Sequence, residues 1–203
     1  MVSNHFDRPT LWIFAGPNGS GKSTVYSDAF LQDFDGSIWI INPDLLTTEI
    51  KEMEGLEQQA ANLAAVQRIE AWLHASLGVR RSVGVETVLS TPKYRKLVEK
   101  ARNLGFSVRL VYVVLKSAEL QMERIRIRVA KGGHDVPEDK VFGRRKRSFE
   151  QLQWFLDQAD RVDMFDNSGA APRRIGEKQD DGTIIVDPSA PGDLIEALQA
   201  GTD

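Results

Sequence analysis

Cysteine is absent from the sequence, and the three histidines (His5, His74 and His134) lie far apart. The lack of cysteine excludes disulfides, thiolate nucleophiles, iron–sulfur clusters and cysteine-based zinc sites. The scattered histidines argue against a histidine-based metal site. No apolar run approaches the ~18–20 residues that a membrane-spanning helix needs, and the first residues lack the apolar region of a signal peptide. We therefore expect a cytoplasmic protein with no membrane partner.

A strong excess of charge of either sign is also absent. The 26 lysines and arginines nearly balance the 29 aspartates and glutamates, and the net charge is −3. This composition gives no general attraction to nucleic acid, so any such interaction would need a local basic patch. The length of 203 residues suits one domain with a real core. We expect a single domain over 1–203, with a basic lid at about 124–147 and a C-terminal appendage at about 170–203.

Apolar runs alternate with helical patterns along the chain. Strands are expected at Leu11–Ala15, 37–41, 82–89, Phe106–Leu115 and Arg161–Phe165. Helices are expected from about 22, at 56–77, from Thr91-Pro92, at 118–130 and from Pro137, followed by a hairpin over 173–186 and a short last helix. This alternation predicts an α/β fold with a mostly parallel five-stranded sheet and helices on both faces. Ligands of such sheets bind at the carboxyl ends of the strands, where Gly16, Asp44, Glu86 and Asp166 are expected.

The segment after the first strand matches the P-loop pattern G-x-x-x-x-G-K-[ST] at every fixed position. Its residues are Gly16, Pro17, Asn18, Gly19, Ser20, Gly21, Lys22, Ser23 and Thr24. The glycines permit a tight turn with inward-facing amides, and the following helix adds its positive N-terminal dipole. Lys22 is expected to bind the β- and γ-phosphates of a nucleotide, and the Ser23 hydroxyl is expected to bind Mg²⁺. The alternative is a glycine-rich turn without a ligand.

Two acidic positions favour a kinase among P-loop proteins. Asp44 follows the second strand and could accept the proton of a substrate hydroxyl, although it could equally cap the next helix. Glu86, followed by Thr87, interrupts the apolar third strand, and an unpaired buried carboxylate is costly. Binding of substrate hydroxyls or of water around Mg²⁺ would explain Glu86, and a solvent-facing strand end is the alternative.

A basic stretch lies between the fourth and fifth strands. Nine of the 24 residues from 124 to 147 are lysine or arginine, and they flank Gly132-Gly133. The pattern is typical of a kinase lid that closes over a triphosphate, with one arginine from each side of the hinge in contact with it. Solvated helix faces and a nucleic-acid surface are the alternatives. His134 is expected to position the lid turn, and Asp166-Asn167-Ser168 are expected to serve a structural role.

Together these motifs resemble the zeta-toxin-like P-loop kinases. The resemblance rests on the P-loop, Asn42-Pro43-Asp44, Glu86-Thr87, residues 132–138 (GGHDVPE) and Asp166-Asn167-Ser168, and it covers about residues 10–168. It implies an ATP- and Mg²⁺-dependent kinase that phosphorylates the sugar 3′-hydroxyl of UDP-N-acetylglucosamine. It also implies a toxin role and an antitoxin partner that blocks the nucleotide site. Within the family this chain is most similar to short relatives whose substrates are mostly unassigned.

The resemblance also implies roles for individual residues. Lys22 would bind the phosphates, Asp44 would act as the base, and Glu86 and Thr87 would contact the substrate. Arg128 and Arg144 would act from the lid. Relatives show Arg-Tyr-x-Arg-Ser where this chain has Arg144-Arg145-x-Arg147-Ser148, so Arg144 and Arg145 both remain candidates.

Three functions compete at this point. The first is a kinase for a small hydroxyl-bearing molecule such as a UDP-N-acetyl sugar. The second is an ATPase, but the apolar run ending in Asp-Glu that it predicts is only weakly matched by 82–86. The third is a nucleic-acid-binding protein or 5′-kinase that uses 124–147, and the sequence pI of about 5.7 argues against it.

Overall fold

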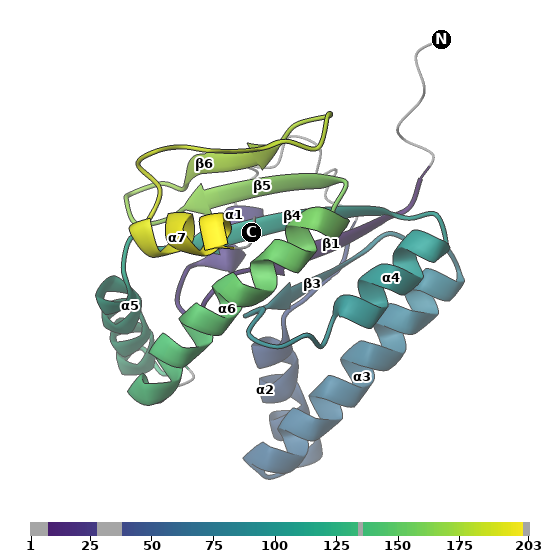
Figure 1. Cartoon of the computed structure of the whole chain (residues 1–203). Helices are drawn as coiled ribbons and strands as arrows, with labels where there is room; N and C mark the ends of the chain where they lie inside the picture. Colours follow the sequence, from purple (N-terminus) through teal and green to yellow (C-terminus); the bar gives the residue numbers. More distant parts are fainter. Residues whose placement is uncertain (1–7, 28–37, 134–135, 201–203) are drawn as a thin grey trace.

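A computed structural model describes residues 8–27, 38–133 and 136–200, which form one seven-stranded sheet with helices on both faces (Figure 1). The strands are β1 (Thr10–Ala15), β2 (Ile40–Ile41), β3 (Val83–Thr87), β4 (Ser107–Val114), β5 (Arg161–Asp166), β6 (Arg173–Lys178) and β7 (Ile184–Val186). The helices are α1 (Lys22–Ser27), α2 (Pro43–Glu54), α3 (Gln58–Gly78), α4 (Arg95–Asn103), α5 (Ala118–Ala130), α6 (Glu138–Gln158) and α7 (Gly192–Ala200).

The sheet has the order β2-β3-β1-β4-β5-β6-β7. Its first five strands are parallel, as the sequence predicts. The C-terminal hairpin is present and extends the same sheet, because β6 pairs antiparallel with β5 and β7 pairs antiparallel with β6. The predicted strand over 37–41 is short, since only Ile40–Ile41 pairs with β3 among its described residues.

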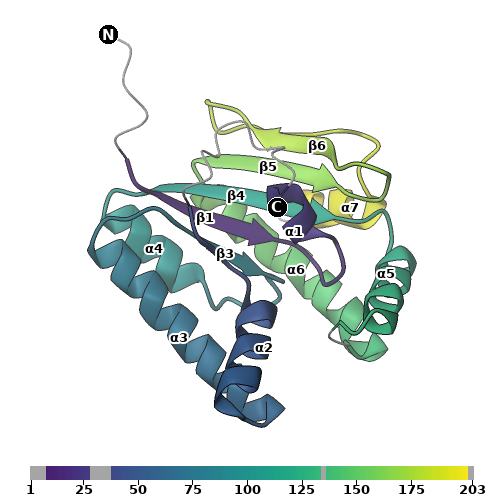
Figure 2. The ribbon, with the colours of Figure 1, turned by 180° about the vertical axis from the view of Figure 1, so that it is seen from behind.

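Alternation along β1 divides the core into two layers. Leu11 and Ile13 belong to the larger hydrophobic cluster, which also contains side chains of α3, α4, α6 and α7. Trp12 and Phe14 point to the other face, where they cluster with Val25 of α1. Successive side chains of a strand point to opposite faces, so a strand buried on both sides is continuously apolar. Figures 1 and 2 show α3, α4, α6 and α7 on one face and α1 on the other.

Two helix starts determine how the carboxyl edge of the sheet is arranged. Ser117 caps α5, as predicted, and its side chain accepts a hydrogen bond from the amide of Leu120 at 3.2 Å. The helix expected at Thr91-Pro92 begins only at Arg95. The residues between β3 and α4 therefore form an irregular segment that ends in a single turn from Pro92 to Arg95, and this segment lies beside the site described next.

Candidate active site

The P-loop joins β1 to α1 and exposes bare backbone. Gly16 has φ +144°, and a Cβ there would lie 2.0 Å from the carbonyl oxygen of Val113. Gly21 has φ +79°, and a Cβ there would lie 2.2 Å from Nδ2 of Asn167. Neither position has room for a side chain. The sterics thus explain both glycines and leave a cradle that suits a phosphate chain, as the motif predicts.

Asn167 supports this loop from outside. Its Nδ2 donates to the carbonyl oxygen of Ser20 at 2.9 Å, and its backbone N–H donates to the carbonyl oxygen of Val114. The residue is 6% exposed. The neighbouring Ser168 amide donates to Oδ1 of Asp166 at 2.9 Å. These contacts fit the structural role expected of the Asp166-Asn167-Ser168 segment. His134, the other residue expected to serve a structural role, lies outside the described residues.

The Lys22 side chain folds back along the P-loop. Its Nζ donates to the carbonyl oxygens of Gly16 and Pro17 at 3.0 and 3.3 Å and lies 3.7 Å from Oε1 of Glu86. Burial lowers the pKa of Lys22, and the nearby carboxylates of Glu86 and Asp44 oppose this shift. A buried ammonium held by two carbonyls and a carboxylate can be attracted to an incoming phosphate chain.

The Glu86 carboxylate binds several side chains of the site and does not face solvent as a strand end would. Its side chain is 14% exposed, and Oε2 accepts hydrogen bonds from the hydroxyl of Tyr26 at 3.0 Å and from Nδ2 of Asn42 at 2.9 Å. Burial, followed by the charge of Glu86, raises the pKa of Tyr26 to about 12. Tyr26 therefore keeps its proton near neutral pH and donates a hydrogen bond to the carboxylate. Neither Tyr26 nor Asn42 was singled out as a partner of Glu86 from the sequence.

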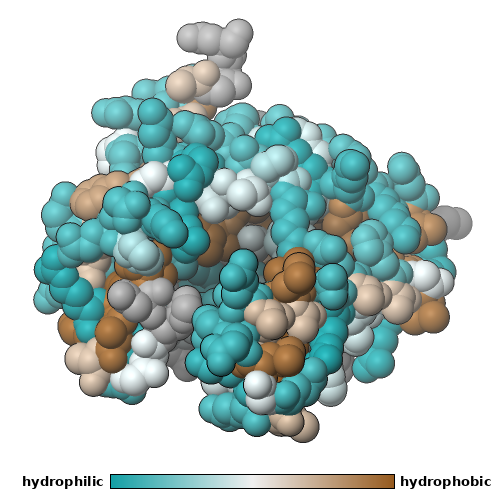
Figure 3. Space-filling view, turned by 90° about the horizontal axis from the view of Figure 1, so that it is seen from below, coloured by the Kyte–Doolittle hydropathy of each residue, from teal (hydrophilic) through white to brown (hydrophobic). Residues whose placement is uncertain are grey.

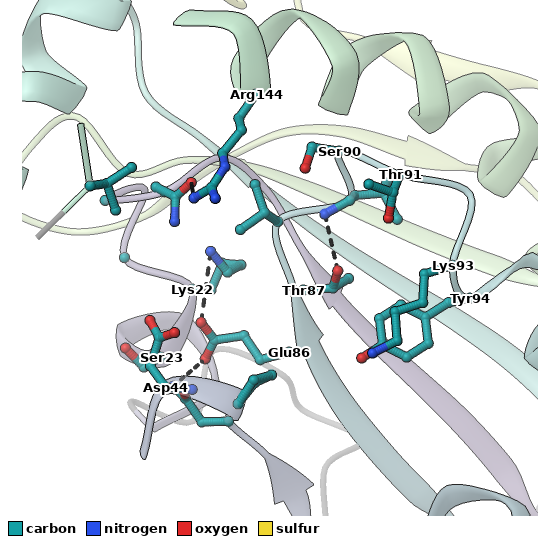
Figure 4. A pocket seen from close by; sticks show the side chains of 18 of the residues that line it. Lys22, Ser23, Asp44, Glu86, Thr87, Ser90, Thr91, Lys93, Tyr94 and Arg144 are labelled. Atoms are coloured by element: carbon teal, nitrogen blue, oxygen red, sulfur yellow. Dashed lines mark hydrogen bonds and ion pairs between the residues drawn. The ribbon is translucent and has the colours of Figure 1, made fainter. Parts of the chain in front are cut away.

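Asp44 lies in the first turn of α2 without capping it. The cap is Asn42, whose Oδ1 accepts from the amides of Asp44 and Leu45 at 2.9 and 3.3 Å. The helix-cap interpretation of Asp44 is therefore wrong, because the residue two positions earlier already fills that place. The exposed side chain of Asp44 lines the cavity near Ser23 and Glu86 instead (Figure 4).

A cavity of about 590 Å³ connects these residues with the two lid helices. Such a volume is typical of small-molecule sites. Arg124 and Arg128 reach it from α5, and Arg144 reaches it from α6. Nη1 of Arg144 donates to Oδ1 of Asn18 in the P-loop at 3.3 Å. The side of the molecule seen in Figure 3 is mostly hydrophilic and hollowed near its middle, with hydrophobic side chains in separate patches.

Neighbouring positions in the lid serve different purposes. Arg145 is 3% exposed, and its guanidinium donates to both carboxylate oxygens of Asp193 at 2.7 and 2.9 Å and to the carbonyl of Leu115 at 2.9 Å. Arg145 thus ties α6 to α7 and faces away from the P-loop, whereas Arg144 contacts it. Arg126 pairs with Glu138 on the surface. Lys131, Lys140, Lys146 and Arg147 are exposed. The basic stretch is therefore divided between a cavity wall, a buried anchor, a surface ion pair and solvated side chains.

Much of the remaining cavity wall comes from residues that carry no recognised motif. Thr87 lines the cavity as expected, but its Oγ1 accepts a hydrogen bond from the amide of Leu89 at 3.1 Å. Beyond it the cavity is lined by Val88, Leu89, Ser90, Thr91, Lys93, Tyr94, Asn62 and Val66. The sequence offered one misleading signal for this wall, Thr91-Pro92, which suggested a helix start.

Ser23 lines the same cavity and fits its expected role toward Mg²⁺. In the described part of the chain, no group of three or more histidine, aspartate or glutamate side chains could hold a metal ion alone. A cation here would thus depend on oxygen ligands from a bound nucleotide together with the Ser23 hydroxyl, as is usual for Mg²⁺ in proteins.

No helix of the described residues is long and apolar enough to cross a bilayer.

The match to a known family covers most of this site. A family model described as an AAA domain matches residues 11–152, more than half of the chain. The chain belongs to this family of P-loop, kinase-like domains. The match includes the P-loop, Asp44, Glu86 and the lid, and it ends within α6. A protein of Haemophilus influenzae, described as uncharacterized, is 29% identical over 141 residues, covering 66% of this chain and 96% of that protein.

Two solved structures are similar over nearly the whole chain. One belongs to the PezAT chromosomal toxin–antitoxin system of Streptococcus pneumoniae, with a TM-score of 0.63, 17% identity and coverage of 97% of this chain and 85% of that chain. The other is the AvrRxo1-ORF1:-ORF2 complex with ATP, with a TM-score of 0.69, 17% identity and coverage of 97% and 65%. This chain therefore spans slightly less than two thirds of the second protein. At such identity the similarity establishes the fold, which is the P-loop kinase-like fold expected from the motifs.

Proposed function

We propose that this protein is an ATP- and Mg²⁺-dependent kinase that transfers the γ-phosphoryl group to a hydroxyl of a small molecule. One observation carries the proposal. Lys22, the carboxylate of Asp44 and the arginines Arg128 and Arg144 all line one cavity. The rest of its wall carries the hydroxyls of Ser90, Thr91 and Tyr94 and the amide of Asn62 beside apolar side chains. A hydrolase needs no such second wall, whereas a kinase must hold an acceptor there.

Each residue of the cavity has a definable part in this reaction. The P-loop amides and Lys22 would bind the phosphates, and Ser23 would bind Mg²⁺, which when present neutralises charge on the β- and γ-phosphates. Asp44 would accept the proton of the attacking hydroxyl. Arg128 and Arg144 would stabilise charge that develops on the transferring group in the closed site. Glu86 would hold Lys22 and Asn42 in place and contact the acceptor together with Thr87.

The acceptor we favour is a nucleotide sugar of the UDP-N-acetyl type, as the resemblance to zeta-toxin-like kinases implies. An antitoxin-like partner that covers the nucleotide site belongs to the same proposal. One of the similar structures comes from a toxin–antitoxin system, which supports this partner class without assigning it to the present chain. A nucleic-acid surface over 124–147 is less well supported, because Arg145 is buried and Arg126 is paired with Glu138.

The variant Asp44→Asn tests the proposal at its chemical step. The rate of phosphoryl transfer should fall ~10²–10⁴-fold, which is the usual contribution of a positioned general base. ATP affinity should stay within about threefold, because the P-loop amides and Lys22 supply most of the phosphate contacts. The measurement combines single-turnover transfer with equilibrium binding of an ATP analogue.

Asn42→Ala is the matched control for the adjacent structural role. Removing this cap should lower the free energy of unfolding by about 1 kcal/mol, whereas Asp44→Asn should leave it nearly unchanged. A folded Asp44→Asn protein that turns over normally would exclude Asp44 as the base.

A further inference from the structure

The segment Val88–Thr91 forms a wall of the active-site cavity directly after β3. All four residues line the cavity, and Ser90 and Thr91 are seen there in Figure 4. The same cavity is lined by P-loop residues and by Asp44. A molecule that receives the phosphoryl group from a nucleotide on the P-loop would have to rest against this wall.

The backbone of this wall is held in an uncommon conformation. Leu89 has φ +60°, in the left-handed region that a residue with a Cβ rarely adopts, and its side chain is 1% exposed. A leucine remains in such a conformation only where surrounding contacts over-determine it, and such residues cluster at functional sites. The contacts that fix Leu89 therefore show what shapes the wall.

Two side-chain hydroxyls hold the peptide group that joins Val88 to Leu89, one at its N–H and one at its carbonyl. Oγ1 of Thr87 accepts from the amide of Leu89 at 3.1 Å, and Oγ of Ser148 in α6 donates to the carbonyl of Val88 at 2.8 Å. Ser148 is 0% exposed and lies 2.8 Å from the hydroxyl of Tyr112 in β4. Since the single Ser148 proton goes to Val88, Tyr112 must donate to Ser148. Burial raises the pKa of Tyr112, so this donor keeps its proton at neutral pH.

We propose that Ser148 is a positioning residue for the acceptor: through the Val88 carbonyl it fixes the start of the wall Val88–Thr91, with Thr87 holding the N–H of the same peptide group. This inference rests on the proposed kinase function. It also couples the two ends of the cavity. Arg144, which contacts the P-loop, and Ser148 are four residues apart on α6 and so share one face of the helix. Any movement of α6 displaces the nucleotide-side arginine and the acceptor wall together.

The test compares Ser148→Ala with Thr87→Val in the full chain by hydrogen exchange. Each variant removes one hydroxyl that holds the wall. The net free energy of such a hydrogen bond corresponds to a roughly tenfold change in the equilibrium between the closed and the locally opened backbone. Amide exchange over 87–91 should accelerate about tenfold in each variant, while exchange in the P-loop stays unchanged. Ser82→Ala is the matched control. The Ser82 hydroxyl, at the opposite end of β3, accepts a hydrogen bond from the Thr10 amide at 2.9 Å. This variant should leave 87–91 unaffected.

A kinetic arm uses UDP-N-acetylglucosamine and a panel of small hydroxyl compounds as acceptors. In Ser148→Ala the acceptor KM should rise about tenfold, with the ATP KM within twofold of wild type. Unchanged exchange over 87–91, or accelerated exchange with an unchanged acceptor KM, would overturn the positioning role. Absence of transfer by the wild-type chain to every acceptor would contradict the kinase proposal instead, and the exchange result would then decide alone whether Ser148 holds the wall.

Discussion

The two ends of the cavity are built in different ways. The phosphate end is one contiguous segment, Gly16–Thr24, whose shape follows from sterics that exclude side chains at Gly16 and Gly21. The end that we propose for the acceptor is assembled from α2, α3, α6 and the segment after β3, and the hydroxyls of Thr87 and Ser148 hold that segment in place. A contiguous backbone cradle can be recognised in many sequences, whereas a wall drawn from separate elements can vary with the acceptor.

This contrast leads to variants that should affect one end of the cavity and spare the other. The variants considered next act on the lid helices, which touch both ends.

Arg128→Ala should have the largest effect among these variants. An arginine that stabilises the transferring phosphoryl group can be worth ~10³–10⁵ in rate, and its effect should exceed any loss of ATP affinity because the charge develops in the transition state. The measurement pairs a transfer assay with oligonucleotide binding across a salt series. If Arg128 instead lay on a nucleic-acid surface, its replacement would leave transfer unchanged and would reduce the slope of log affinity against log salt concentration by about one unit. That result would favour the nucleic-acid interpretation.

The adjacent arginines of α6 provide a smaller but sharper comparison. Arg144→Ala should slow transfer by roughly tenfold or more, as expected when a charged hydrogen-bonding group is lost from the site, and should leave the melting temperature close to wild type. Arg145→Ala should lower the free energy of unfolding by about 2 kcal/mol, because the Leu115 carbonyl and the Asp193 carboxylate lose their buried partner. Kinetics and thermal melts of both variants provide the test. If Arg145→Ala impaired transfer without destabilising the fold, the two roles would be reversed.

Much of the fold was predictable from the sequence, for a physical reason. Strands buried on both faces are continuously apolar, so β1 and β4 were recognisable, and Ser117 marked the start of α5 as a short polar cap. The hairpin was predicted, but its pairing with β5 was not, because a hairpin sequence does not specify which edge it joins. Asn42 was overlooked as the cap of α2 since Asp44 is an equally good cap residue on propensity alone.

The site was predictable only at residues that belong to a recognisable motif or that interrupt a local sequence pattern. Lys22, Asp44, Glu86 and Arg144 do line one cavity, and their chemical roles remain proposals. The choice between Arg144 and Arg145 depended on which side of α6 faces the P-loop, and this is a tertiary fact. Ser148 was noted only as the last residue of the Arg144-Arg145-x-Arg147-Ser148 pattern, and Leu89 gave no signal. The roles of a buried serine and a left-handed leucine are recognisable only through their contacts.

The fate of the γ-phosphate of ATP tests the central proposal most directly. Phosphorus NMR of the full chain with ATP, Mg²⁺ and the acceptor panel would follow every product in one sample, with Lys22→Ala as the inactive control. We expect a phosphate monoester of one acceptor to appear in equal amount to ADP, and neither product with Lys22→Ala. Release of inorganic phosphate alone at the same rate with and without every acceptor would contradict a kinase and identify the protein as a nucleoside triphosphatase.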